Sequence, residues 1–213
     1  MSSPKLWRGQ TLKDRSLDRR EQMLDVGEEL LGTGGVSAVT TRAVMRQTNL
    51  SPRYFYETFD SREDLIIAVY DRVESRLFER MRGVRTADGL RAAIREIFEI
   101  CAQYFEEDPG RARILLREPL ADDTLRRHSA DRAPTFLRML IPVLGAEAGA
   151  IVPADEEALA IAATALSGSL VSLYLEWVDG RLPVSRERLA TAAVAMVFAQ
   201  LEAVRQHDRG DGA

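Results

Sequence analysis

Hydrophobic residues along this chain recur at three- and four-residue steps, and no stretch alternates apolar with polar positions as a half-buried strand does. Residues 17–33 carry one such apolar face, which Gly34 and Gly35 end. Longer faces follow Leu65 and Leu90. The pattern therefore predicts an all-α fold.

Two short helices joined by a tight turn are predicted after this first face. Thr40 is placed to cap the first of them, residues 41–48, because its hydroxyl accepts a hydrogen bond from a free backbone N–H. Asn49 tolerates the left-handed conformation that ends a helix. Ser51 at the N-cap and Pro52 at the first helical position then begin the second helix. This arrangement predicts a helix-turn-helix.

A long helix is predicted to begin near Ser61, where a serine cap and an acid three residues later resemble a capping box. A strongly apolar helical face starts at Leu90, and a short helical piece at residues 111–117 precedes Glu118 and Pro119. The apolar stripe of the long helix consists of Leu65, Ile66, Val69, Val73, Leu77 and Met81.

The last two helical segments, residues 154–178 and 185–205, are apolar nearly all round. Such a pair must pack on its own domain and on something else, which in a homodimer is its symmetry mate in a four-helix interface. A core formed wholly within one chain is the alternative. We expect the dimer interface to contain Leu159, Leu166, Leu170, Leu173, Trp177, Leu189 and Met196.

Charge is distributed unevenly along the chain. The net charge is −4, yet residues 1–20 hold six basic and two acidic side chains. A positive segment beside a helix-turn-helix on an acidic body is typical of a protein that binds DNA with one end. A solvated charged tail is the alternative interpretation.

Several classes of protein are disfavoured by composition. No apolar run approaches the ~18 to 20 residues that span a bilayer, and the first twenty residues do not resemble a signal peptide, so we expect a cytoplasmic protein without a membrane partner. One cysteine and two histidines argue against a disulfide or a metal site. No catalytic constellation or phosphate-binding glycine loop is present, so we expect neither an enzyme nor a bound cofactor.

The sequence predicts four parts. Residues 1–16 form a flexible basic arm, and residues 17–60 form the helix-turn-helix DNA-binding domain. Residues 61–207 form a larger helical domain that ends in the two helices expected to dimerise, followed by a disordered tail at residues 208–213.

The second short helix carries side chains suited to a major groove. Arg53 and Tyr54 are the candidates for base contacts, because arginine makes bidentate bonds to guanine and tyrosine donates to DNA oxygens. Packing within the small domain is the alternative for Tyr54 and Tyr56. The full set of DNA-binding candidates is Thr41, Arg42, Ser51, Arg53, Tyr54, Tyr56 and Arg62.

Several residues match a known family at its spacing: Gly35, Thr40, Val44, Leu50, Ser51, Tyr56, Phe59 and the helix start at residues 61–65. Residues 19–65 thereby resemble the DNA-binding domain of TetR-family transcriptional regulators. The resemblance implies an all-helical homodimer, three N-terminal helices for DNA, a C-terminal domain with an effector cavity, and dimerisation through the last two long helices. The family often has other residue types at the positions of Thr48, Asn49, Arg53, Thr58 and Arg62.

The effector cavity that the resemblance implies would lie in the domain of residues 61–207, which then serves effector binding and dimerisation. An apolar pocket needs a few polar groups among its aromatic and aliphatic side chains. Candidates of this kind are Phe98, Cys101, Tyr104, Phe105, His128, Phe136 and Tyr174, for each of which a place in the ordinary core is the alternative.

The expected function is that of a ligand-responsive repressor, released from a palindromic double-stranded operator by a small apolar or amphipathic effector. An enzyme and a helical scaffold that has lost DNA binding are the alternatives. A gel shift on DNA flanking the gene distinguishes the three, because only the first predicts salt-sensitive, sequence-specific binding.

Overall fold

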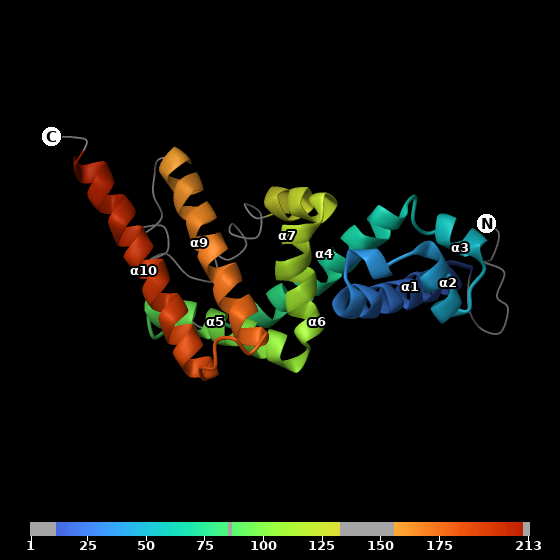
Figure 1. Ribbon diagram of the computed structural model, residues 1–213, viewed down its shortest axis with the longest axis horizontal. Coiled ribbons are helices and arrows are strands. Elements are labelled where there is room, and N and C mark those ends of the chain that lie inside the picture. Colours follow the sequence, from blue (N-terminus) through green and yellow to red (C-terminus); the bar gives the residue numbers. More distant parts are fainter. Residues whose placement is uncertain (1–11, 85–86, 133–155, 211–213) are drawn as a thin grey trace, which may run out of the picture. The chain divides into compact units, whose positions relative to one another are not determined.

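The computed structural model describes residues 12–84, 87–132 and 156–210, and every regular element in these ranges is helical (Figure 1). The predicted all-α fold is therefore confirmed. None of the described helices is long and apolar enough to cross a bilayer. In chain order the elements are α1 (Leu12–Gly34), η1 (Val36–Ala38), α2 (Thr41–Thr48), α3 (Pro52–Tyr56), α4 (Arg62–Met81), α5 (Leu90–Glu107), α6 (Pro109–Ala112), η2 (Arg113–Arg117), α7 (Glu118–Ala121), a helical stretch at residues 123–132, α9 (Glu156–Val178) and α10 (Arg186–Gly210).

The chain folds into two compact units. The first combines residues 1–74 with residues 113–128, and the second combines residues 75–112 with residues 129–213. The first unit is thus larger than the predicted DNA-binding domain of residues 17–60. It also contains the beginning of α4 and the segment of residues 113–128.

The apolar faces of α1 and α4 form the core of the first unit. Met23 and Leu31 are fully buried, and the part of the predicted α4 stripe that lies in this unit, from Leu65 to Val73, has exposures from 0 to 2%. The last two stripe residues, Leu77 and Met81, are buried in the second unit. Gly27 lets the two helices approach closely, because a Cβ there would lie 2.9 Å from Cγ2 of Val69. Phe55 of α3 is also fully buried in this unit.

A buried carboxylate joins η2 and α7 to the connection between α1 and η1. Glu118 is 7% exposed; one of its oxygens accepts from the backbone N–H of Val36 at 2.9 Å, and the other accepts from Nε of Arg113 at 3.0 Å. Arg113 also donates through Nη1 to the carbonyl of Thr33 at 2.6 Å. We call Glu118, Arg113, Gly35 and Val36 the Glu118 cluster. These bonds explain why the segment at residues 113–128 packs with the first unit.

In the second unit, α10 lies against α5 and α9 (Figure 1). The apolar face predicted for α5 is buried at Ile94, Ile97 and Phe98. Tyr174 of α9 donates its hydroxyl to the carbonyl of Phe98 at 2.8 Å. Trp177 donates its indole N–H to the carbonyl of Val184 at 2.9 Å, which closes the connection between α9 and α10.

Helix α9 is apolar on nearly every side, yet few of its side chains are covered within one chain. Among its residues whose exposure is described, Tyr174 alone is buried. Ile161 is 63% exposed, and Leu166, Leu170 and Leu173 are half-buried. A single chain therefore leaves much of the apolar surface of α9 open.

Candidate nucleic-acid interface

Helix α2 begins and ends as local sequence chemistry predicts. Thr40 has an extended backbone, and its hydroxyl accepts a hydrogen bond from the N–H of Ala43 at 3.1 Å. Asn49 adopts the left-handed conformation with φ 54° and ψ 32°. The predicted cap and the predicted turn are both confirmed, and together they fix the direction in which the chain enters α3.

Helix α3 starts at Pro52, where proline needs no intrahelical N–H partner. Ser51 occupies the N-cap position with an extended backbone, but its hydroxyl makes no capping hydrogen bond. The side chain of Ser51 is exposed instead. Its hydroxyl therefore lies at the protein surface at the start of α3.

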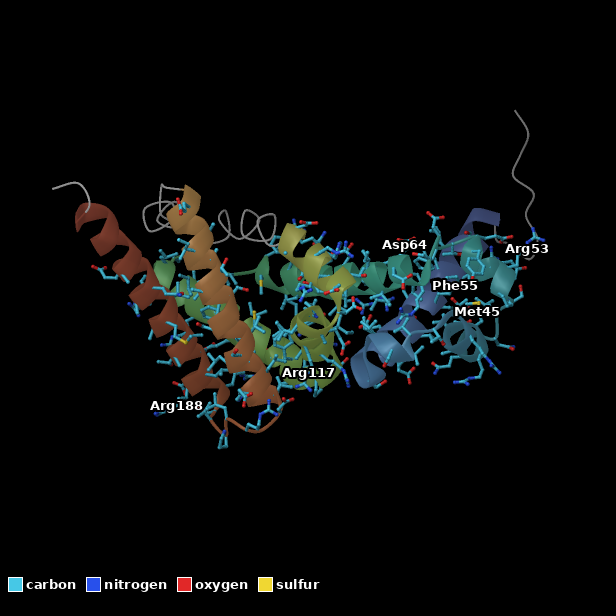
Figure 2. The ribbon with its side chains drawn as sticks, turned by 45° about the horizontal axis from the view of Figure 1, so that its top comes forward. Met45, Arg53, Phe55, Asp64, Arg117 and Arg188 are labelled. Carbon is cyan, nitrogen blue, oxygen red and sulfur yellow. The ribbon has the colours of Figure 1, made fainter. Side chains whose placement is uncertain are left out.

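The side chains of α3 divide into an inner and an outer set. Phe55 is fully buried and packs against Phe59, with ring centroids 5.9 Å apart. Tyr56 is 65% exposed, and the Arg53 side chain is 84% exposed. Figure 2 shows Phe55 within the helices of this unit and Arg53 at its outer edge. Burial of Phe55 thus anchors α3 with Arg53 and Tyr56 facing outward.

Arg53 forms an ion pair with Glu57, one helical turn further along the chain. Its Nε lies 2.7 Å from Oε1 of Glu57. The hydrogen bond and the charge of the carboxylate raise the pKa of the Arg53 guanidinium above its ordinary value. Both side chains are exposed.

Tyr54 is partly exposed on α3 and also contacts α1. The guanidinium of Arg19 lies 4.5 Å from the centre of the Tyr54 ring, a cation–π distance. Thr58 donates its hydroxyl to the carbonyl of Tyr54 at 2.8 Å, and Tyr54 is half-buried. One face of the ring is therefore used inside the unit, in agreement with the packing alternative for this residue.

Arg62 binds the backbone of its own unit. Its guanidinium donates from Nε to the carbonyl of Val39 and from Nη2 to the carbonyl of Val36. Nη1 lies 3.0 Å from Oε1 of Glu63. The predicted phosphate contact of Arg62 stays a prediction, but these three partners already occupy the guanidinium.

Helix α2 presents two arginines to solvent, one turn apart. Arg42 and Arg46 are exposed, and neither has a carboxylate partner among the residues that the structure describes. Thr41 is half-buried beside them. Arg46 was not among the sequence candidates, although its spacing of four residues from Arg42 places both on one helix face.

Candidate effector residues on α5 and α9 lie together in the second unit. Phe98, Tyr104, Phe105 and Tyr174 are buried, and the rings of Phe105 and Tyr174 are 5.7 Å apart. Burial raises the pKa of the Tyr174 hydroxyl above its ordinary value. Cys101 is half-buried overall, and the protein around its sulfur raises the pKa of the thiol to about 12.

The other two effector candidates are not part of this aromatic group as described. His128 belongs to the first unit, where its Nε2 lies 2.7 Å from Oδ1 of Asp71 and its ring meets Tyr70 edge-on at 5.6 Å. Phe136 lies outside the described residues. Any role for either in effector binding stays a prediction.

The predicted dimer residues differ in how far one chain already covers them. Leu166, Leu170, Leu173, Trp177 and Met196 are half-buried, whereas Leu189 is 1% exposed. Leu189 therefore belongs to the chain's own core and has no surface left to offer a second copy. The side chain of Leu159 lies outside the described part.

An open depression of 440 Å³ lies in the first unit, lined by Arg62 and the Glu118 cluster among others. Its charged groups already bond to backbone or to one another. Within the described ranges, no group of three or more His, Cys, Asp or Glu side chains is arranged to hold a metal ion.

Helices α2 and α3, joined by the turn at Asn49 and with Arg53 facing outward from α3, have the arrangement of a helix-turn-helix unit. Residues 23–69 match the model of the bacterial regulatory proteins of the tetR family. The fold is that of a TetR-family regulator from Streptomyces coelicolor, with a TM-score of 0.64, 19% identity, and coverage of 92% of this chain and 86% of that one. Residues 23–69 are therefore similar to the DNA-binding segment of the tetR family, and the fold is similar to that of TetR-family regulators.

Other similar proteins differ in what their names describe. The regulator FadR from Bacillus subtilis, solved in complex with stearoyl-CoA, has a TM-score of 0.66 at 15% identity and covers 83% of this chain and 96% of its own. The nucleoid occlusion factor SlmA from a Marinomonas species is 27% identical over 136 residues, which cover 61% of this chain and 69% of SlmA. SlmA from Vibrio cholerae is 26% identical over 155 residues, with 69% and 79% covered.

Proposed function

We propose that this protein is a ligand-responsive repressor that leaves a palindromic operator when a small effector binds. The observation that supports DNA binding best is the surface of α3, where buried Phe55 holds Arg53 and Tyr56 outward. Arginine and tyrosine at such positions contact base edges and phosphates. Arg42 and Arg46 on α2 supply further positive charge for the DNA backbone.

Homodimerisation through α9 and α10 is the second part of the proposal. It is supported by the open apolar surface of α9 in a single chain, including Ile161 at 63% exposure. A twofold dimer carries two copies of α3, which fit two half-sites one helical turn apart. The operator is therefore expected to be palindromic.

The effector is proposed to be small and apolar or amphipathic. The aromatic group of Phe98, Tyr104, Phe105 and Tyr174 on α5 and α9 supports this class, because such ligands bind in apolar surroundings with a few polar groups. The FadR neighbour was solved with stearoyl-CoA, an amphipathic molecule of this kind. Stearoyl-CoA is therefore a reasonable first probe.

DNA binding is tested by footprinting on the DNA that flanks the protein's own gene. We expect a salt-sensitive protected site, and we expect Arg53→Ala to weaken it by ~1–3 kcal/mol and to relax one base preference. Arg188→Ala, which removes an exposed arginine from α10, is the matched control and should leave the site unchanged. Absence of any sequence-specific protection would favour a scaffold without DNA binding.

Effector response is tested on the same protected site. Stearoyl-CoA is expected to raise the thermal midpoint of the protein, because a ligand stabilises the folded state that binds it. It is also expected to weaken the protection, because an effector that favours the conformation released from DNA lowers the affinity for the operator. A midpoint that rises without any loss of protection would contradict release by this effector class.

A role in nucleoid occlusion is a second candidate, because curated relatives at 26 to 27% identity carry that name. Fluorescence microscopy of cells that overproduce the chain tests it. Division blocked over the nucleoid would support this role, whereas normal division with altered transcription of a few genes would support the repressor.

A further inference from the structure

We propose that Glu57 is a specificity-determining residue of α3, which holds Arg53 so that its guanidinium offers both terminal amino groups to one guanine. This inference rests on the proposed DNA-binding function of the helix. It assigns a role to a carboxylate at a surface where acidic groups are otherwise unfavourable for DNA.

The backbone places the two side chains on one face. Glu57 directly follows α3 in a helical conformation, with φ −76° and ψ −16°, and its N–H donates to the carbonyl of Arg53 at 3.1 Å. Residues four apart on a helix are neighbours on its surface. The Nε of Arg53 accordingly lies 2.7 Å from Oε1 of Glu57.

This bond selects which N–H groups of Arg53 remain free. A guanidinium has one N–H at Nε and two at each terminal nitrogen. Glu57 takes the Nε donor, so a side-on contact through Nε and one terminal nitrogen is blocked. Neither terminal nitrogen of Arg53 has a partner among the described residues. An end-on contact through both terminal nitrogens is what remains.

End-on presentation matches guanine. Guanine offers two acceptors, O6 and N7, on its major-groove edge, whereas adenine replaces the first with an amino donor. An arginine fixed end-on therefore makes two bonds to guanine and one to adenine. An arginine free to rotate finds phosphates and other bases, so its contribution to discrimination is smaller.

The pair is not expected to exist for stability or for affinity. Exposed ion pairs of this spacing contribute little to folding, and a carboxylate near DNA repels phosphates. Neutralising Glu57 should therefore have two opposite effects. It should raise affinity for DNA in general, and it should lower discrimination at the base pair that Arg53 contacts.

The experiment selects bound sequences from a pool of duplex DNA with a randomised centre, using the full-length protein. Wild type, Glu57→Gln, Arg53→Ala and the double variant are compared, with Glu187→Gln on α10 as the control for loss of an exposed acid. Circular dichroism establishes that each variant is folded. Binding to one fixed non-enriched duplex measures general affinity.

We expect wild type to prefer guanine at one position of each half-site and Arg53→Ala to lose that preference. In Glu57→Gln the preference should fall about five- to tenfold at that position alone, while binding to the fixed duplex becomes tighter. In the Arg53→Ala background, Glu57→Gln should change no base preference. Glu187→Gln should match wild type.

Different failures identify different errors. No enrichment by wild type would contradict the proposed DNA-binding function and this inference with it. Enrichment by wild type with an unchanged profile in Glu57→Gln would contradict the inference alone. A base preference that Glu57→Gln still alters in the absence of Arg53 would show that Glu57 contacts a base itself and would overturn the positioning role.

Discussion

The guanidinium of Arg62 connects the start of α4 to the loop that precedes α2. It donates to the carbonyls of Val36 and Val39, and its side chain is 31% exposed. The carbonyl of Val36 also accepts the N–H of Val39 at 3.2 Å, whereas the carbonyl of Val39 follows the end of η1. Arg62 therefore supports the geometry of the helix-turn-helix through the fold, whether or not it also meets a phosphate.

Arg62→Ala is expected to lower the free energy of unfolding by about 2 kcal/mol, because hydrogen bonds from a charged donor are lost and two carbonyls are left without it. Arg62→Lys should lower the free energy of unfolding less, since the lysine ammonium can replace some of the hydrogen bonds that the guanidinium donates. Urea unfolding without DNA measures both. If Arg62 served only a phosphate, the unfolding midpoints would match wild type and only the salt dependence of DNA binding would change.

Local chemistry explains why some residues of this site are predictable from sequence. Thr40, Asn49 and Pro52 act on backbone within a few residues, so their roles as cap, turn and helix start follow from the sequence and are confirmed. The partners of Arg62 lie 23 and 26 residues away. From the sequence, the position of Arg62 at a helix start indicated a phosphate contact. Its hydrogen bonds to the carbonyls of Val36 and Val39 depend on tertiary packing, which the sequence does not show.

At the scale of elements, the Glu118 cluster joins η2 and α7 to η1. Gly35 has φ 73°, and a Cβ there would lie 2.6 Å from Oε1 of Glu118. Position 35 therefore requires glycine for two reasons: its backbone has a positive φ, and the carboxylate of Glu118 occupies the space of a Cβ. The second requirement is the one that links two elements far apart in the sequence.

Gly35→Ala is expected to destabilise the protein by about 1–3 kcal/mol, because a side chain is strained at this φ and meets Glu118. In the background of Glu118→Ala the cost of Gly35→Ala should be smaller, since the steric part is removed and the conformational part remains. Chemical denaturation of the two single variants and the double variant measures this difference. Strictly additive costs would contradict a direct contact.

The helices and the turn between α2 and α3 were largely predictable, whereas the junction between η2 and α7 was not. The apolar stripe of α4 repeats at helical spacing, so its burial follows from periodicity. The sequence predicted a helical piece at residues 111–117 that precedes Glu118 and Pro119, and the structure places both of these residues in α7, since proline is tolerated in a first helical turn. The burial of Glu118 depends on Val36, 82 residues earlier, which no local pattern indicates.

At the scale of the whole molecule, the apolar side chains of α9 that stay exposed in one chain form the surface that the proposed dimer would bury. Most of its leucines are half-buried in one chain, and Ile161 is largely exposed. Apolar surface of this extent on a monomer favours association. The sequence identified the helix pair, but it did not separate Leu189, which one chain buries, from the residues that remain available.

Leu170→Glu is expected to convert the proposed dimer into a monomer, because a charge within an apolar interface is left unpaired. Ser75→Glu on α4 introduces the same charge at an exposed polar position and should leave the mass unchanged. Light scattering after size-exclusion chromatography measures the mass of each. A Leu170→Glu variant that is folded and still dimeric would place the interface elsewhere.

The discontinuous first unit has a consequence for building hybrid regulators. When DNA-binding domains are exchanged between related proteins, the transplanted domain is usually one contiguous piece of chain. Here a transplant that ends within α4 would leave behind Arg113 and Glu118, and the N–H of Val36 and the carbonyl of Thr33 would lose their partners. A hybrid that keeps its stability has to carry residues 113–128 together with residues 1–74.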